Sequence, residues 1–146
     1  MPPKKSEEFN YTPRIVIGND EKVLKIVDYP ILRVRIKYKH TLTSTPVECL
    51  VDSGSVINLF PASWGVLLKI PIKSGQLQKI YGIGGVSIES YRHDVHFYII
   101  DSKINFRTYA YFSEKQNTPL LGRYGFFDMF KNVSFNQDRG SFTLTK

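Results

Sequence analysis

The chain has 146 residues, of which 42% are hydrophobic and 14% are aromatic, and its formal net charge is +7 at pH 7. This composition supports a buried core and excludes a disordered chain. No apolar run approaches the roughly 20 residues of a membrane-spanning helix, so we expect no membrane partner.

The first residues, 1–8, are rich in proline, lysine and glutamate and contain no apolar stretch of the secretory type. We therefore predict a flexible segment over residues 1–13, a single domain over residues 14–146, and a cytoplasmic protein. Cys49 is the only cysteine and stands in an apolar stretch. A free cysteine in such a position indicates a buried structural thiol rather than a disulfide.

Alternation of apolar and polar residues predicts an all-β domain. Strands are expected at residues 14–17, 31–38, 47–51, 86–91, 95–100 and 107–112. Helical signals are limited to residues 61–68, where Pro61 suits a first turn, and to residues 124–130. Residues 132–146 predict a final hairpin whose turn lies at residues 137–140.

Basic residues alternate along the predicted strand 31–38, where Arg33, Arg35 and Lys37 are followed by Lys39. Because Leu32 and the other apolar residues occupy the alternate positions, the simplest interpretation is the solvated face of a half-buried strand. We therefore expect no nucleic-acid partner. A basic nucleic-acid-binding domain is the non-enzymatic alternative.

Other chemistry has little support in the sequence. His93 and His96 are three residues apart on a predicted strand, which places them on opposite faces and makes a poor metal pair. The glycines at 82, 84 and 85 lack the Gly-Lys-Ser/Thr sequence of a phosphate-binding loop. We expect neither a metal nor a cofactor.

One carboxylate stands in a distinctive setting, because Asp52-Ser53-Gly54-Ser55 follows directly on the apolar residues Leu50 and Val51. Gly54 permits a tight turn, and the two serine hydroxyls can hydrogen-bond around Asp52. An Asp-Ser-Gly tripeptide by itself is typical of a surface turn. The assignment of a catalytic role to Asp52 therefore depends on other segments.

Two later segments supply that support. Residues 79–88 run from apolar through glycine-rich to alternating, which predicts a long hairpin with a mobile tip. Residues 118–127 contain Leu120-Leu121-Gly122-Arg123, which predicts a short buried strand that ends at glycine and leads into a helical turn.

Together these segments resemble the retropepsin-like aspartic proteases over residues 30–146. The resemblance implies a closed all-β barrel or sandwich with a flap hairpin and one or two short helices. It implies that Asp52 is catalytic and that Ser53, Gly54 and Ser55 support its loop. The flap and substrate-binding residues that it implies are Tyr81, Gly82, Ile83, Gly84 and Gly85. The implied structural signature is Leu121, Gly122 and Arg123. The apolar residues Leu50, Val51 and Leu120 suggest apolar substrate pockets.

The chain departs from the family pattern at three places. The family more often has threonine at the position of Ser53, and some viral members have aspartate at the position of Val56, where it pairs with the residue matching Arg123. The predicted hairpin at residues 132–146 is more similar to the cellular members than to the short viral ones.

The sequence contains one Asp-Ser-Gly, whereas the chemistry of this family needs two facing carboxylates. We therefore expect a homodimer in which each protomer supplies one Asp52 to hydrolyse polypeptide substrates. We also expect the Ser55 hydroxyl to donate to the outer oxygen of Asp52, which favours the ionised carboxylate and activity in acid. The alternative is a catalytically silent module of the same fold that dimerises or binds peptides.

Overall fold

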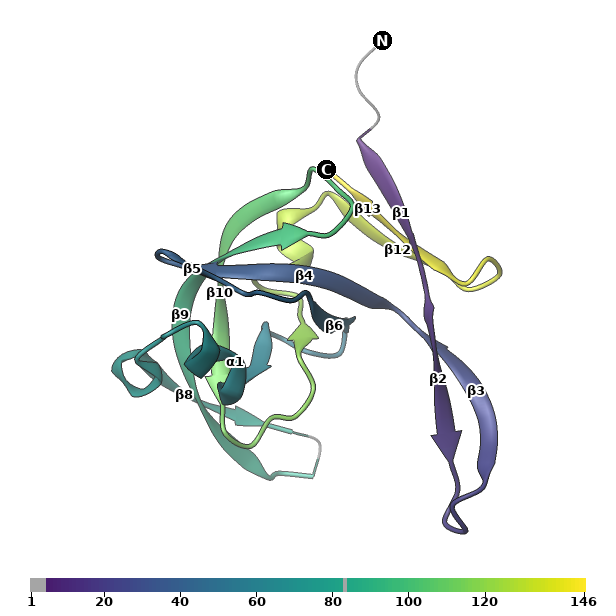
Figure 1. Ribbon diagram of the computed structural model, residues 1–146, viewed down its shortest axis with the longest axis horizontal. Coiled ribbons are helices and arrows are strands. Elements are labelled where there is room, and N and C mark those ends of the chain that lie inside the picture. Colours follow the sequence, from purple (N-terminus) through teal and green to yellow (C-terminus); the bar gives the residue numbers. More distant parts are fainter. Residues whose placement is uncertain (1–4, 83) are drawn as a thin grey trace. The chain divides into compact units, whose positions relative to one another are not determined.

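The computed structural model describes residues 5–82 and 84–146, and strands make up most of this part of the chain. Contacts divide it into two units. One unit contains the described residues up to Ile31 together with Met129–Lys146, and the other contains Leu32–Asp128. Figure 1 shows the order of the elements along the chain.

The Leu32–Asp128 unit is built around a closed barrel (Figure 1). Its strand order is β4-β6-β11-β7-β10-β9, and β9 pairs with β4 to close the circle. The bounds are β4 (Ile31–Tyr38), β6 (Val47–Val51), β11 (Leu120–Leu121), β7 (Leu59–Pro61), β10 (Asn105–Ser113) and β9 (Ser87–Ile99).

Shorter elements complete this unit. Strands β5 (Thr41–Leu42) and β8 (Gln76–Tyr81) pair with β4 and β9, respectively. One helix, α1 (Ala62–Leu67), follows β7, and the 3-10 turns are η1 (Ile72–Ser74) and η2 (Phe127–Met129). No helix in the described part of the chain is both long enough and apolar enough to cross a membrane.

The barrel core follows from the alternation in its strands. On β4, Leu32, Val34 and Ile36 are buried, whereas Arg33 between them is exposed. The Phe60 ring lies 5.8 Å from that of Phe97, and a third phenylalanine, Phe112, is equally buried. Burying a side chain of this size stabilises the fold by roughly 1.5–3 kcal/mol. The predicted amphipathic character of residues 31–38 is confirmed.

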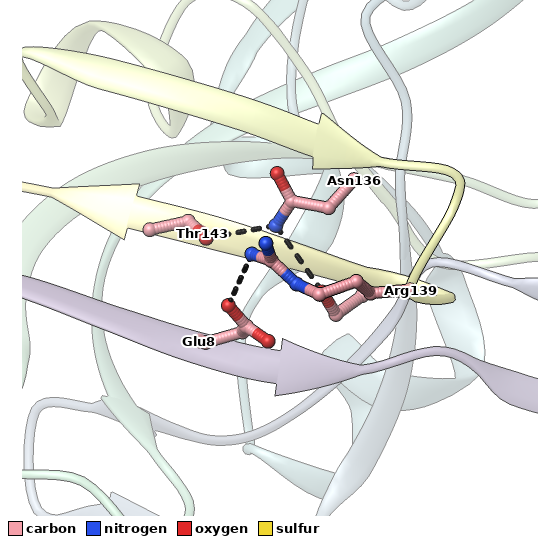
Figure 2. Close-up of polar contacts among 5 residues, drawn as sticks. Glu8, Asn136, Arg139 and Thr143 are labelled. Carbon is pink, nitrogen blue, oxygen red and sulfur yellow. Dashed lines mark hydrogen bonds and ion pairs between the residues drawn. The ribbon is translucent and has the colours of Figure 1, made fainter.

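The other unit contains a three-stranded sheet in which β13 (Ser141–Thr145) lies between β1 (Ser6–Asn10) and β12 (Asn132–Asn136). Figure 2 shows the polar contacts that cross it. Arg139, in the turn between β12 and β13, reaches Glu8 on β1 with an Nη2–Oε2 distance of 2.7 Å. The Asn136 amide donates to the Thr143 hydroxyl at 3.0 Å. The predicted C-terminal hairpin is confirmed.

The same unit contains a two-stranded hairpin of β2 (Thr12–Ile17) and β3 (Val23–Tyr29), in which Ile15 is paired with Ile26. Both of these isoleucines are exposed, at 61% and 68% respectively. A hairpin of two strands gains little stability from its own contacts in water.

The N-terminal prediction needs correction, because residues 6–10 form β1 rather than a flexible segment. Five consecutive register pairs join β1 to β13, and the ring of Phe9 stacks on that of Phe142 at 5.5 Å. The stretch was predicted to be flexible because residues 1–8 are rich in proline, lysine and glutamate and contain no apolar stretch. Its pairing partner lies more than 130 residues away, between Ser141 and Thr145, where local patterns cannot indicate it.

Two other predictions differ in detail. The strands predicted at residues 86–91 and 95–100 are one continuous strand, β9, because its first half pairs with β8 and its second half with β10 and β4. Pro61 is the residue before α1 and has an extended ψ of 137°, so the helix begins one residue later than predicted. Residues 124–130 contain only the 3-10 turn η2.

The predicted burial of Cys49 and the predicted placement of His93 and His96 on opposite strand faces are confirmed. Cys49 is fully buried, and burial raises the pKa of its thiol well above the ordinary value. His93 is buried with its Nε2 2.7 Å from the Ile72 carbonyl, whereas His96 faces outward and contacts Asn105. Among the described residues, no group of three or more potential metal ligands occurs.

Burial of Cys49 predicts an unreactive thiol. The thiolate is the reactive form of a cysteine, and the native fold both excludes the reagent and raises the pKa of the Cys49 thiol. A disulfide reagent at pH 8 should therefore label the folded chain on the order of a hundredfold more slowly than the chain unfolded in urea. The variant Ser63→Cys, at an exposed helical position, should label one additional thiol rapidly in the folded state. Equal rates for folded and unfolded wild-type chain would contradict the buried position.

Candidate active site

Three strands of the barrel position Asp52. Strand β11 lies between β6 and β7: it runs parallel to β6, with Leu121 opposite Val51, and antiparallel to β7, with Leu120 opposite Leu59. Residues 52–58 therefore leave the end of β6, pass the end of β11 and return on its other side as β7. This connection places Asp52 where β6 ends.

Backbone amides hold Asp52 and its carboxylate. The Asp52 amide donates to the Leu121 carbonyl at 3.0 Å, which continues the pairing of β6 with β11 by one residue. The carboxylate Oδ1 accepts from the Gly54 amide at 2.8 Å, and the Ser55 amide donates to the Asp52 carbonyl at 3.1 Å. A hydrogen bond from an amide to a carboxylate is stronger than one between neutral groups. The side chain is therefore fixed while remaining partly exposed.

Residues 123–124, which follow β11, hydrogen-bond to residues 55–56 of the loop. The Arg123 amide donates to the Ser55 carbonyl at 2.9 Å, and the Tyr124 amide donates to the Val56 carbonyl at 2.8 Å. Ile57 and Tyr124 form an isolated parallel bridge. Arg123 thus contacts the loop through its backbone amide.

Gly122 is needed because the loop passes directly over it. A Cβ at this position would lie 2.2 Å from the carbonyl oxygen of Ile57 and 2.5 Å from its carbonyl carbon. These are backbone atoms, so no side-chain rotation relieves the clash. The predicted role of Leu121-Gly122 behind the loop therefore has a steric basis.

Asn58 is a residue of this site that sequence reasoning missed. Its Oδ1 accepts from the Gly122 amide and its Nδ2 donates to the Tyr109 carbonyl, both at 3.0 Å. The side chain is fully buried, so it links the loop, the end of β11 and β10 in the interior. The one available signal was a single polar residue between Ile57 and Leu59 in an otherwise apolar run.

The predicted bond from Ser55 to the Asp52 carboxylate is wrong. The Ser55 hydroxyl instead donates to the Ile57 carbonyl at 2.7 Å, because the turn brings that acceptor to the hydroxyl. The Ser55 hydroxyl therefore does not make the hydrogen bond on which its expected effect on Asp52 depended. Ser53 and Gly54 are exposed beside Asp52.

The predicted pocket residues separate into two groups. Val51 is only 3% exposed, since Val47, Cys49 and Val51 form the inward-facing side of β6, so its assignment to a pocket is corrected to the core. Leu50 and Leu120 are half-buried and stand opposite each other on β6 and β11. Ile83, predicted for the flap, lies outside the described residues.

The predicted long hairpin is present as β8 and the first part of β9, which pair from Gln76–Arg92 to Tyr81–Ser87. At its tip the Gly82 amide donates to the Val86 carbonyl at 3.0 Å. Gly84 and Gly85 have positive φ angles of +97° and +81°, which residues other than glycine rarely adopt. Tyr81 and Val86 are about 70% exposed, so the tip has little packing.

Comparison with known proteins gave matches among solved structures. A retropepsin-like aspartic protease from Rickettsia conorii matches with a TM-score of 0.59 and 11% identity, covering 95% of this chain and 90% of that one. EIAV protease complexed with the inhibitor HBY-793 matches with a TM-score of 0.49 and 22% identity, covering 74% and 88%. Neither a family model nor a curated protein matches.

The chain has a retropepsin-like fold. The Rickettsia conorii structure establishes this through its coverage of nearly the whole chain, and the predicted fold class is confirmed. Within this fold, Asp52 directly follows β6, in the connection that leads past the end of β11 to β7.

Gly122→Ala tests the close approach of loop and strand. The new Cβ would meet the backbone of Ile57, so we expect the free energy of unfolding to fall by about 2–4 kcal/mol in urea titrations, with an unchanged denaturant slope. The control is Gly82→Ala, whose Cβ would have no atom nearer than 3.8 Å. Equal stability of Gly122→Ala and the control would show that the loop does not cross here.

Proposed function

We propose that this protein is an aspartic endopeptidase, active as a homodimer in which each protomer contributes Asp52. The observation that carries the proposal is the carboxylate of Asp52, fixed by the Gly54 amide at the point where a loop crosses the end of β11. A carboxylate that is both held by backbone and open to solvent is suited to activating water.

The proposed dimer follows from the count of carboxylates. The chain has one Asp-Ser-Gly, and a two-fold axis beside this loop would bring two copies of Asp52 face to face. Ser53 and Gly54 are exposed next to the carboxylate, and Val56 is 50% exposed on the same loop. These residues would be available for contact with the second protomer.

The proposed mechanism depends on electrostatics. Two carboxylates within a few ångströms cannot both ionise at low cost, so the pair retains one proton. One Asp52 would take a proton from a water held between them, and that water would attack the scissile carbonyl. The other Asp52 would donate its proton to the carbonyl oxygen as the tetrahedral intermediate forms. The reaction needs no covalent intermediate.

The hairpin of β8 and β9 would serve as the flap. An extended peptide can pair with exposed backbone in the manner of an added strand, and closure over it excludes water from the carboxylates. Among the described residues, no atom apart from those of the chain neighbours lies within 4 Å of the Cβ positions of Gly84 and Gly85, so packing at these two positions would not oppose movement of the tip. Leu50 and Leu120 would favour apolar substrate side chains.

Asp52→Asn tests the catalytic assignment. The substituted side chain keeps an oxygen that can accept from the Gly54 amide, so we expect an unchanged fold with kcat/KM reduced on the order of a thousandfold. Cleavage of a denatured protein measures activity, and thermal unfolding measures the fold. Asp138→Asn, in the exposed turn after β12, is the matched control and should keep full activity. Near-wild-type turnover by Asp52→Asn would refute the proposal.

Mixing the two chains separates a dimeric enzyme from a monomeric one. When equal amounts of wild type and Asp52→Asn associate at random, about a quarter of the dimers contain two intact carboxylates. The activity of the wild-type chain should then fall to about half of its unmixed value. An activity that does not change on mixing would show that one protomer suffices.

Gly84→Val tests the flap. Its φ of +97° is strained for a β-branched residue, and the stiffened tip should lower kcat/KM at least about tenfold with little change in melting temperature. Gly82→Ala, at the same tip but without a positive φ, should retain most of the activity. Unchanged kinetics in Gly84→Val would remove the flap role from this hairpin.

A further inference from the structure

Three neighbouring barrel strands bring basic side chains from distant parts of the sequence into one row. In the register, Lys37 on β4 stands opposite His96 on β9, and His96 stands opposite Arg107 on β10. Directly opposed residues on adjacent strands point to the same face with Cβ atoms about 4.5–5.5 Å apart. All three side chains lie on the outer face of the barrel, opposite the buried Ile36 and Phe97.

The next row on this face adds aromatic and polar groups. Tyr98 stands between Arg35 on β4 and Asn105 on β10. The rings of His96 and Tyr98 stack with centroids 4.6 Å apart, and His96 Nε2 lies 2.9 Å from Asn105 Oδ1. The aromatic pair is therefore held in place between flanking cations.

The surface is hollowed where these rows meet. A cavity of about 520 Å³ is lined in part by Lys37, Lys39, His96, Tyr98 and Arg107. Asp94 is the one acidic residue among its lining residues, and its carboxylate lies 3.9 Å from Arg92. The cavity lining therefore has an excess of positive charge.

The cations that face this hollow are not neutralised. In the described part of the chain, ion pairs join Arg33 to Asp101 and Arg139 to Glu8, but no carboxylate pairs with Lys37 or Arg107. Lys37 and Arg107 flank His96 from the two strands on either side of β9, and unpaired like charges gathered on one face repel each other, which an anionic ligand would relieve.

We propose that this face, formed by Arg35, Lys37, His96, Tyr98 and Arg107, binds single-stranded nucleic acid. Proteins that bind single strands combine a positively charged groove for phosphates with aromatic rings on which bases stack. A duplex keeps its bases paired and covered, so it could use the cations but not the ring stack. The site is independent of Asp52 and adds a second binding activity to the proposed peptidase. It replaces the expectation, drawn from the β4 sequence alone, that this basic strand face is only solvated, because β9 and β10 add His96, Tyr98 and Arg107 to it.

The decisive measurement is fluorescence anisotropy of a labelled 16-nucleotide oligouridine titrated with the full chain. We expect binding that weakens as salt rises, with a log–log slope between about −1.4 and −2.8 for two to four phosphate contacts at roughly 0.7 each. Lys37→Glu with Arg107→Glu should weaken binding at least tenfold and reduce the slope by about 1.4. Tyr98→Ala should weaken it about fivefold or more through lost stacking.

The matched control is Lys22→Glu with Lys25→Glu, which changes the net charge equally at exposed positions of the β2–β3 hairpin. It should bind oligouridine nearly as wild type does. The neutral pair Lys37→Gln with Arg107→Gln, checked by thermal unfolding, should show an intermediate loss and excludes misfolding as the cause.

Three results would overturn the proposal. One is the absence of binding at about 50 mM salt, where contacts to phosphates are strong. Another is equal weakening by the site and control charge reversals, which would indicate net charge alone. The third is that polyglutamate or duplex displaces the labelled strand as effectively as unlabelled oligouridine does. That result would indicate a surface that binds any polyanion.

Discussion

The close approach of the Ile57 carbonyl to Gly122 is the constraint on which the candidate site depends. Without a Cβ at Gly122, the loop after β6 can cross the end of β11 at backbone contact distance. The same crossing lets the amides of Arg123 and Tyr124 donate to Ser55 and Val56. A larger residue would push the loop outward, and the carboxylate of Asp52 would move with it. Sterics at one atom thus decide where the Asp52 carboxylate lies.

Hydrogen bonds from a buried side chain complete what the glycine permits. The side-chain amide of Asn58 accepts a hydrogen bond from the backbone N–H of Gly122 and donates one to the backbone carbonyl of Tyr109. Without Asn58, the loop crossing would leave these two backbone groups unpaired in the interior. Each such bond contributes about 1 kcal/mol net, whereas leaving either group unpaired costs roughly 1–3 kcal/mol. Asn58 therefore supports the loop that carries Asp52. The arrangement joins β6, β7, β10 and β11 into one support for the loop.

Part of the fold and of the candidate site was accessible from local patterns. Alternation predicted β4 and β6, and glycine placement predicted the hairpin of β8 and β9. Asp52, Leu121 and Gly122 were recognisable because each belongs to a short motif of consecutive residues. Val51 was misassigned because alternation gives two faces without saying which faces the core. The contact of Ser55 was wrong because a hydroxyl takes the nearest suitable acceptor, which depends on the path of the turn.

The sequence by itself determined which residues can form strands, where the chain must turn, and which carboxylate is placed in a glycine turn, because these properties depend on neighbours within a few positions. Tertiary structure alone decided which strands pair and which side chains meet. It paired β1 with β13 across the length of the chain and buried Asn58 under the loop. It also aligned Lys37, His96 and Arg107 in one row. Strand register is a property of two segments at once, so neither segment's sequence contains it.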